Sequence, residues 1–252
     1  MDRIAIISDI HGNMPALETV LADISHRKLD TIYCLGDLVG KGPHAELVVD
    51  RCRACCAMTV KGNWDDFIVT ETSNPTLQWH QRRLGAERLA YLKNLPTTIE
   101  FYMSGRAVRL FHASHNSVYY RVRMSDTAEK QLEMFTNTDF TGHALVPDVV
   151  GYGDIHNAFL KSFHHKVLFN AGSVGNPLDL TLASYAILEG DYASKTPGGF
   201  SVQLVRVPYD IDLAIQQAAD EQMPELALYA NELRTARYRG LSSPPPSQTA
   251  AE

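Results

Sequence analysis

The feature that most constrains the fold is a regular alternation of apolar runs and amphipathic stretches in the first 62 residues. Three short, largely apolar runs have the composition of strands, at residues 3–8, 31–35 and 57–60. The stretch 15–28 separates the first two runs and has apolar residues at helical spacing. Between the last two runs, Pro43 is expected in the first turn of a second helix. Strand, helix, strand, helix, strand predicts a parallel sheet with helices packed against it.

The second half of the chain is predicted to be rich in strands. After a mostly helical stretch at 65–92, broken at Asn74-Pro75, short apolar runs recur with tight connections. These runs lie at 97–102, 107–112, 149–151, 158–163, 167–170, 184–188 and 201–207, with one helical piece at 127–135. Two sheets stacked face to face, with helices outside, would bury this many strands. The predicted fold class is α/β, with two stacked mixed β-sheets flanked by helices in a four-layer αββα sandwich.

A single domain is expected over residues 1–240, because no shift in composition divides the strands from one another. Two amphipathic helices, near 211–219 and 224–237, are predicted to close it. After Gly240 the chain turns to Ser, Pro, Gln and Ala, a composition that cannot bury a core. Residues 241–252 are therefore predicted to form a disordered tail.

Charge and hydropathy exclude several classes of partner. The formal net charge is −6, which gives no overall attraction to nucleic acid or to an anionic membrane. No apolar run approaches the roughly 20 residues needed to span a bilayer, and the apolar start of the chain is too short for a signal peptide. We expect a cytoplasmic protein that binds no membrane and shows no sign of nucleic-acid binding. The sequence does not indicate its oligomeric state.

The four cysteines are interpreted as reduced thiols. Cys52-Arg53-Ala54-Cys55 has the spacing of half a zinc site. A structural zinc site usually needs a second pair of similar spacing, and the remaining cysteines, Cys34 and Cys56, do not supply one.

Polar residues that a turn would not need follow the predicted strands. They are Asp9 and His11 after the first strand, Asp37 after the second, Asn63 after the third, and then His112, Asp154 and His156 after later ones. Because the carboxyl ends of parallel strands share one edge of a sheet, these side chains should converge. Each alone is typical of a turn or a buried core residue, so the prediction depends on their order. Carboxylates, imidazoles and an amide suit divalent metals, and seven groups suit two ions bridged by Asp37.

With these motifs, the chain resembles the calcineurin-like metallophosphoesterase superfamily over roughly residues 1 to 190. A further motif, Asn170-Ala171-Gly172-Ser173-Val174-Gly175-Asn176-Pro177, is similar to the family's Gly-Ser-x-Gly segment. Gly62-Asn63-Trp64-Asp65 is similar to the Gly-Asn-x-Asp of the small bacterial phosphodiesterase-like branch. The resemblance implies the two-sheet sandwich. It also implies that Asp9, His11 and His156 hold one metal, that Asp37 bridges, and that Asn63, His112 and Asp154 hold the other.

Two positions depart from the family's pattern. Trp64 replaces the histidine thought to protonate the leaving group, and an indole cannot take over that role. His115 is a candidate replacement, and a histidine in a solvated loop is the alternative. Asp154 stands where the family usually has histidine, which adds a negative charge and favours a hard metal such as Mn²⁺, with Fe or Zn as alternatives. Asn13 and Asp65 are expected to fix the geometry of the ligands.

The predicted function is hydrolysis of phosphate esters by a dimetal centre, with phosphodiesters favoured and a metal-bound hydroxide as the attacking group. Two alternatives stay open. One is a phosphomonoesterase or protein phosphatase with the same centre, and the other is a non-catalytic relative that binds metal or phosphate. The expected substrate is a phosphorylated small molecule that the sequence does not name. The segment 117–123 either lines its pocket or is ordinary apolar cover with exposed arginines.

Overall fold

The structure is a computed structural model, and it describes residues 1–241. One five-stranded sheet, sheet A, has the strand order β10-β9-β1-β2-β3. Its strands are β1 (Asp2–Ile7), β2 (Thr31–Cys34), β3 (Met58–Thr59), β9 (Ala183–Gly190) and β10 (Ser201–Val207). β1 is parallel to β2 and β2 to β3, whereas β9 runs antiparallel to both β1 and β10. The parallel arrangement predicted for the first three strands is confirmed.

The second sheet, sheet B, has the order β4-β5-β6-β8-β7. Its strands are β4 (Thr98–Met103), β5 (Arg106–Phe111), β6 (Val149–Tyr152), β7 (Phe159–Phe163) and β8 (Lys166–Asn170). β5, β6 and β8 are parallel neighbours, and β4 and β7 form antiparallel edges. Both sheets are therefore mixed, as predicted.

The two sheets pack face to face, and the alternation along β1 shows why. Ile4 and Ile6 point into a core that they share with residues of sheet B such as Leu110. Ala5 and Ile7 point to the other face, where they pack against helices. Because β1 is covered on both faces, its sequence is a continuous apolar run instead of an alternating one.

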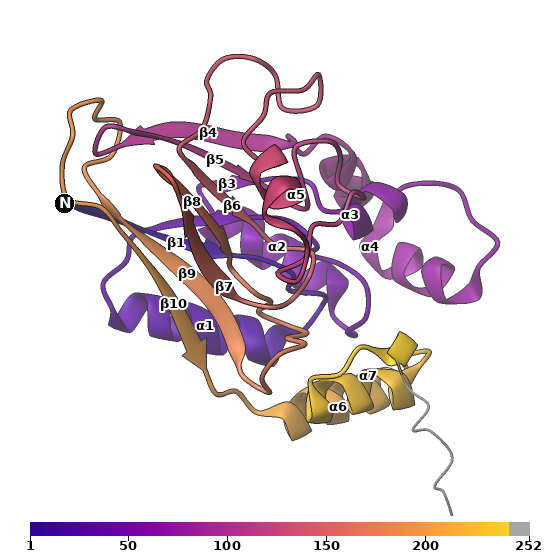
Figure 1. The fold of residues 1–252 in the computed structure, drawn as a ribbon. Coiled ribbons are helices and arrows are strands. Elements are labelled where there is room, and N and C mark those ends of the chain that lie inside the picture. The colour runs from indigo at the N-terminus through magenta and orange to yellow at the C-terminus, as the bar shows by residue number, and fades with distance from the viewer. Residues whose placement is uncertain (242–252) are drawn as a thin grey trace, which may run out of the picture.

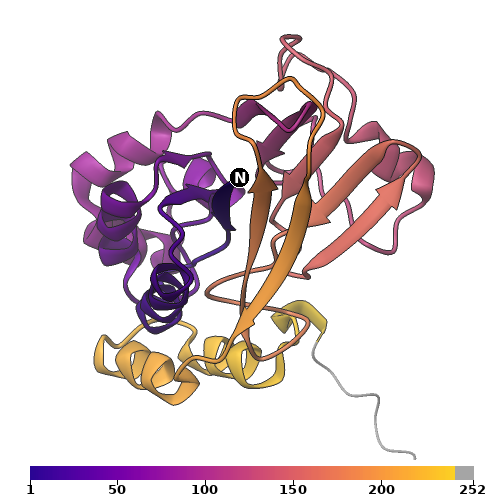
Figure 2. The same cartoon turned by 90° about the vertical axis from the view of Figure 1, so that its left-hand side faces the viewer.

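Helices cover the outer face of each sheet, which confirms the four-layer αββα sandwich (Figures 1 and 2). Sheet A is covered by α1 (Met14–His26), α2 (Ala45–Cys55) and α4 (Pro75–Lys93), with the short α3 (Asn63–Phe67) before α4. Sheet B is covered by α5 (Ala128–Glu133) and the loops beside it. The position expected for Pro43 is wrong, because α2 begins at Ala45 after His44 as the N-cap, so Pro43 lies before the helix. The predicted break at Asn74 is the N-cap of α4.

The chain closes with α6 (Ile211–Asp220), α7 (Leu226–Thr235) and a 3-10 turn, η1 (Arg239–Leu241). α6 and α7 share a small apolar cluster of their own and lie below the sheets in Figure 2. The predicted tail begins at residue 241, and its remaining residues, 242–252, lie outside the described residues.

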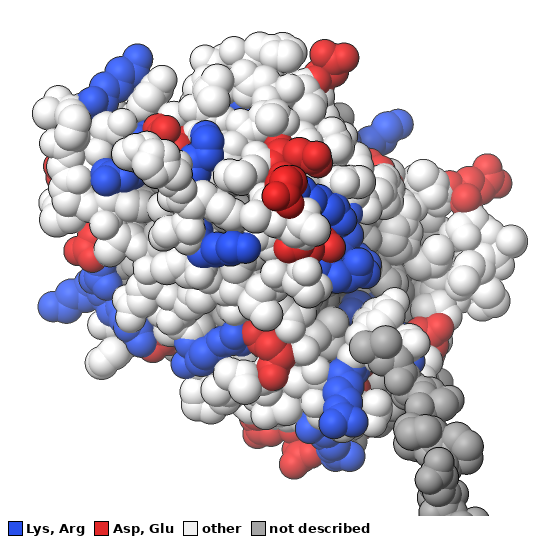
Figure 3. Space-filling model, viewed as in Figure 1, with Lys and Arg blue, Asp and Glu red and all other residues white. Residues whose placement is uncertain are grey.

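The four cysteines are free thiols, with Cys34 and Cys52 buried and Cys55 and Cys56 half-buried. Over the described part of the chain, none of the helices combines the length and the apolar character that crossing a membrane requires. Basic and acidic side chains are interspersed over the face shown in Figure 3.

Candidate metal centre

Five of the seven predicted ligands lie on the loops that follow β1, β2 and β6, and their backbones adopt an uncommon conformation. Asp9, His11, Asp37, Asp154 and His156 all have positive φ, at 55°, 49°, 54°, 61° and 57°. L-residues rarely occupy this left-handed region, and such residues cluster at functional sites when their surroundings hold them there. Here backbone hydrogen bonds join the first two loops, from the N–H of Asp9 to the Gly36 oxygen (2.9 Å) and from the N–H of His11 to the Asp37 oxygen (3.0 Å).

Three buried imidazoles present their Nε2 atoms to the centre of the site. Nδ1 of His11 lies 2.9 Å from the Val39 carbonyl oxygen, and Nδ1 of His112 lies 2.7 Å from that of Leu35. Nδ1 of His156 faces the carbonyl oxygen of Asn176 in the same way. A carbonyl oxygen only accepts, so each Nδ1 carries the proton that it donates. In its neutral form, such a ring directs an Nε2 lone pair inward, which is the form in which histidine binds a metal.

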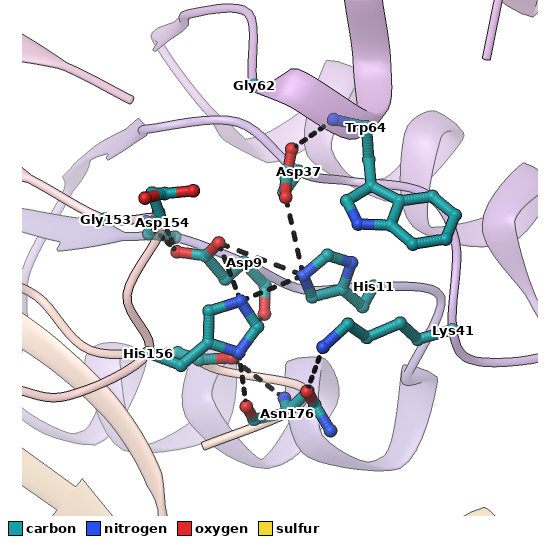
Figure 4. A network of polar contacts seen from close by, with 12 residues as sticks. Asp9, His11, Asp37, Lys41, Gly62, Trp64, Gly153, Asp154, His156 and Asn176 are labelled. Carbon is teal, nitrogen blue, oxygen red and sulfur yellow. Dashed lines mark hydrogen bonds and ion pairs between the residues drawn. The ribbon is translucent and has the colours of Figure 1, made fainter. Parts of the chain in front are cut away.

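Asp9, His11 and His156 form the first group able to hold an ion (Figure 4). Nε2 of His11 lies 3.2 Å from Nε2 of His156, and Asp9 Oδ1 lies 3.2 Å from the latter nitrogen. Two lone pairs that face each other at this distance repel unless a cation or a proton lies between them. Asp9 Oδ1 is buried and has no hydrogen-bond partner within the described chain, although Oδ2 accepts from Ser8 and from the N–H of Asp154. An orphaned carboxylate oxygen beside two facing nitrogens fits a divalent cation.

Asp9, Asp37 and His112 form the second group, which shares Asp9 with the first. Asp37 lies between them, with Oδ2 3.5 Å from Nε2 of His11 and Oδ1 3.5 Å from Nε2 of His112. The amide oxygen of Asn63 lies 3.0 Å from the same nitrogen of His112. Asp37 thus faces both groups, the position that a bridging carboxylate needs.

Asp154 lies at the edge of the second group and is held by an arginine. Its Oδ1 is 4.0 Å from Nε2 of His112. Arg121 donates to both of its oxygens, from Nε to Oδ2 (2.7 Å) and from Nη2 to Oδ1 (2.7 Å). The sequence analysis placed Arg121 in a segment of undecided role and did not anticipate this ion pair.

Buried carboxylates and imidazoles shift one another's pKa values strongly. Burial raises the pKa of Asp37 well above its ordinary value, although His112 opposes the shift. Burial alone would raise the pKa of Asp9 too, but the neighbouring imidazoles, chiefly His156, bring it below the ordinary value. Burial would lower the pKa of His112, but Asp37, Asp9 and Asp154 raise it to about 9. So much negative potential around an imidazole marks a site built for positive charge.

The two side chains expected to fix the ligand geometry, Asp65 and Asn13, hydrogen-bond to backbone groups. The carboxylate of Asp65 accepts from the N–H groups of Asp37 (2.7 Å), Leu38 (3.0 Å) and Gly62 (2.9 Å), which ties the Asp37 loop to the start of α3. Asn13 caps α1 by accepting from the N–H of Ala16 and donates to the carbonyl of Gly175.

Glycine is required at Gly62 by close packing, because a Cβ there would lie 2.1 Å from Asp37 Oδ1. At Gly153 a Cβ would lie 2.5 Å from Asp9 Oδ2. The backbone therefore approaches both carboxylates more closely than any other residue type would allow.

Trp64 and His115 differ in their relation to the site. The indole of Trp64 packs edge-on to His11, with ring centroids 5.9 Å apart, and its backbone N–H donates to Asp37 Oδ1 (2.8 Å). His115 is buried, and its ring contact is with Tyr120. In the described chain no hydrogen bond or ion pair joins its ring to the predicted ligands. The alternative of a solvated loop histidine is wrong, since only 4% of His115 is exposed.

The sequence analysis did not predict that Lys41 lies at the site. Its Nζ donates to Asn176 Oδ1 (2.6 Å) and lies 3.8 Å from Glu232 of α7, and Figure 4 shows it beside His11 and His156. A lysine after Gly36-Asp37 is not informative by itself, because its partners come from 135 and 191 residues further along the chain.

Comparisons with known proteins agree with this geometry. A family model described as a calcineurin-like phosphoesterase superfamily domain matches residues 2–192. An uncharacterized protein of Methanocaldococcus jannaschii is 32% identical over 239 residues, which cover 88% of this chain and 94% of that protein. A symmetrical bis(5'-nucleosyl)-tetraphosphatase of Acidovorax ebreus is 47% identical over 47 residues, which cover 18% of this chain and 17% of that protein. The crystal structure of a metallophosphoesterase from Sphaerobacter thermophilus has a TM-score of 0.75 at 26% identity, with coverage of 93% of this chain and 99% of that one.

Proposed function

The chain is a metal-dependent phosphoesterase that belongs to the calcineurin-like phosphoesterase superfamily, and we propose that it hydrolyses small-molecule phosphodiesters. The family resemblance inferred from the motifs is confirmed. What carries the proposal is the pair of facing Nε2 atoms of His11 and His156, 3.2 Å apart beside the unpaired Oδ1 of Asp9. Such a cluster is unfavourable without a cation and favourable with one.

The proposed assignment of ligands follows the two groups of side chains. Asp9, His11 and His156 would hold one ion, and Asn63, His112 and Asp154 the other, with Asp37 between them. Bound divalent ions would stabilise the negative charge on the phosphoryl oxygens and lower the pKa of the attacking water. The carboxylate of Asp154, in place of an imidazole, favours Mn²⁺ over softer metals.

The protein's own residues influence which leaving groups can depart. Trp64 lies beside His11 where a proton donor would be useful, and its indole N–H is too weak an acid to protonate a leaving oxygen. We do not assign the role to His115, whose ring packs against Tyr120 and hydrogen-bonds to none of the predicted ligands in the described chain. The site therefore favours leaving groups that are stable as anions.

A second candidate substrate class follows from the same reasoning. In a phosphoanhydride, such as a dinucleoside polyphosphate, the leaving group is itself a phosphate and needs no proton to depart. The local similarity to a symmetrical bis(5'-nucleosyl)-tetraphosphatase supports testing this class next to aryl and alkyl diesters.

The test is a comparison of substrates on protein that is first stripped with a chelator and then reconstituted with Mn²⁺. Bis-p-nitrophenyl phosphate, p-nitrophenyl phosphate and diadenosine tetraphosphate are supplied to the wild type and to Asp37→Asn. We expect turnover of the diester to exceed that of the monoester, to need the metal and to be lost in Asp37→Asn. Faster turnover of the monoester would favour a phosphatase. No turnover by fully metallated protein would favour a binding protein.

A further inference from the structure

Arg121 is attached to the candidate centre by one edge of its guanidinium group and leaves the other edge free. Nε and Nη2 donate to the two oxygens of Asp154, each at 2.7 Å. Within residues 1–241, Nη1 donates to no acceptor. The side chain of Arg121 is 44% exposed, whereas that of Asp154 is 2% exposed. The free edge is therefore open to solvent beside a buried cluster of ligands.

The segment that carries Arg121 is anchored on both sides. Val118 and Val122 are buried, and the hydroxyl of Tyr152 donates to the carbonyl of Val122 (2.8 Å). Tyr119 donates through its hydroxyl to Asp66 Oδ2 (2.7 Å). Arg121 consequently starts from a fixed backbone and ends on a buried carboxylate, so little of its rotamer freedom remains to be lost when it binds a ligand.

The ion pair also changes the charge of the site. When ionised, Asp9 and Asp37 bring two negative charges to the two groups, and Asp154 adds a third at the edge of the second group. Arg121 adds one positive charge beside Asp154. An ionised carboxylate has about four lone-pair positions, and the guanidinium occupies one on each oxygen. Asp154 therefore retains lone pairs that can face a metal while it holds Arg121.

We propose that Arg121 is a substrate-binding residue whose free guanidinium edge binds non-bridging oxygens of the phosphoryl group, and that Asp154 positions it. This inference rests on the proposed function. A guanidinium presents paired N–H donors that match two phosphate oxygens, which an ammonium group cannot do. The Asp154–Arg121 pair thus supplies, at a position where the family usually has histidine, both a ligand oxygen and an anion-binding group.

The experiment measures binding of inorganic phosphate by isothermal titration calorimetry to Mn²⁺-loaded protein, with metal content determined on the same samples. The variants are Arg121→Gln, Arg121→Lys and the matched control Arg123→Gln, an exposed arginine two residues along the same segment. Arg121→Lys keeps a positive partner for Asp154 and so guards against a folding defect, which circular dichroism checks.

We expect Arg121→Gln to bind phosphate about tenfold more weakly at unchanged metal content, the loss typical of one charge-assisted contact that stays partly exposed. Arg121→Lys should lose several-fold and Arg123→Gln should match the wild type. KM for the diester should rise in parallel, with a smaller change in kcat.

Unchanged phosphate affinity in folded, fully metallated Arg121→Gln would overturn the inference and leave the proposed function standing. Loss of metal without any specific loss of phosphate would also overturn it, because Arg121 would then only neutralise Asp154. A wild type that binds Mn²⁺ but neither binds phosphate nor turns over any ester would instead refute the proposed function.

Discussion

Replacing Asp65 by asparagine should weaken the protein even before any metal is considered. The Asp65 carboxylate is fully buried and accepts three backbone N–H groups, those of Asp37, Leu38 and Gly62. Asparagine has the same shape, but one of its oxygens becomes an NH₂ group. If its remaining oxygen stays on Asp37 and Gly62, the NH₂ group faces the N–H of Leu38, and two donors oppose each other.

The size of the effect follows from these contacts. One hydrogen bond to a charged acceptor is lost, at about 1.5–3 kcal/mol, and two others become neutral and weaken by about 1 kcal/mol each. Burial raises the pKa of Asp65, so the ionised carboxylate is costly to bury, and removing its charge offsets part of this loss. We expect the free energy of unfolding of metal-free Asp65→Asn to fall by about 3 kcal/mol. Because the Asp37 loop loses its tie to α3, metal affinity should fall as well.

The assay is urea unfolding of chelated protein, followed by metal titration of the folded variant. Asp66→Asn is the matched control, since Asp66 is the next residue and is half-buried, with Lys61 3.4 Å away. Its carboxylate accepts from the hydroxyl of Tyr119, and the amide oxygen of asparagine can still accept that bond. Asp66→Asn should change stability by less than about 0.5 kcal/mol. An Asp65→Asn protein as stable as the Asp66→Asn protein, with unaltered metal affinity, would refute the reasoning that Asp65 holds the ligand loop.

Three further predictions concern the leaving group, the pH dependence and the metals. Trp64→His should speed hydrolysis of alkyl diesters by at most about 10²–10⁴-fold, the contribution of a general acid, and should leave the rate with nitrophenyl diesters nearly unchanged. A hydrolysis rate of the wild type that does not depend on leaving-group pKa would contradict this. Burial, with a smaller effect of Arg83, lowers the pKa of His80 from 6.5 to about 4. The contribution of neutral His80 to the free energy of unfolding should therefore be present above pH 6.5 and should fall by about 2 kcal/mol by pH 5. His80→Gln should abolish this pH dependence in urea unfolding. Chelation should lower Tm by about 5–10 °C in a thermal scan if each ion is present well above its Kd, and an unchanged Tm would argue against bound metal.

Local periodicity was enough to predict the layers of the fold. β1 is apolar on both faces because helices cover one and sheet B the other, and that pattern is visible in residues 3–8 alone. The convergence of Asp9 and Asp37 followed from the parallel strands that precede them. The start of α2 was misplaced at Pro43, because a proline before an N-cap and a proline in the first turn look alike in sequence.

Side-chain contacts between residues that are far apart in the sequence could not be predicted. Arg121 meets Asp154 across 33 residues, and Lys41 meets Glu232 across 191. Periodicity predicts a helix such as α7, but it does not predict which distant side chain its residues contact. The positive φ of His11 could not be predicted either, because the hydrogen bonds of the surrounding loops hold this non-glycine residue in the left-handed region.

The central claim is that Asp37 joins two metal ions in one centre. The most direct test is electron paramagnetic resonance of Mn²⁺-reconstituted protein, combined with metal analysis of the same sample, because bridged Mn²⁺ ions give a spin-coupled signal that isolated ions lack. We predict two ions per chain with a coupled signal in the wild type, and loss of both the coupling and at least one ion in Asp37→Ala. A wild type that holds a single uncoupled ion at saturation, or an Asp37→Ala protein that keeps the coupled pair, would contradict the account.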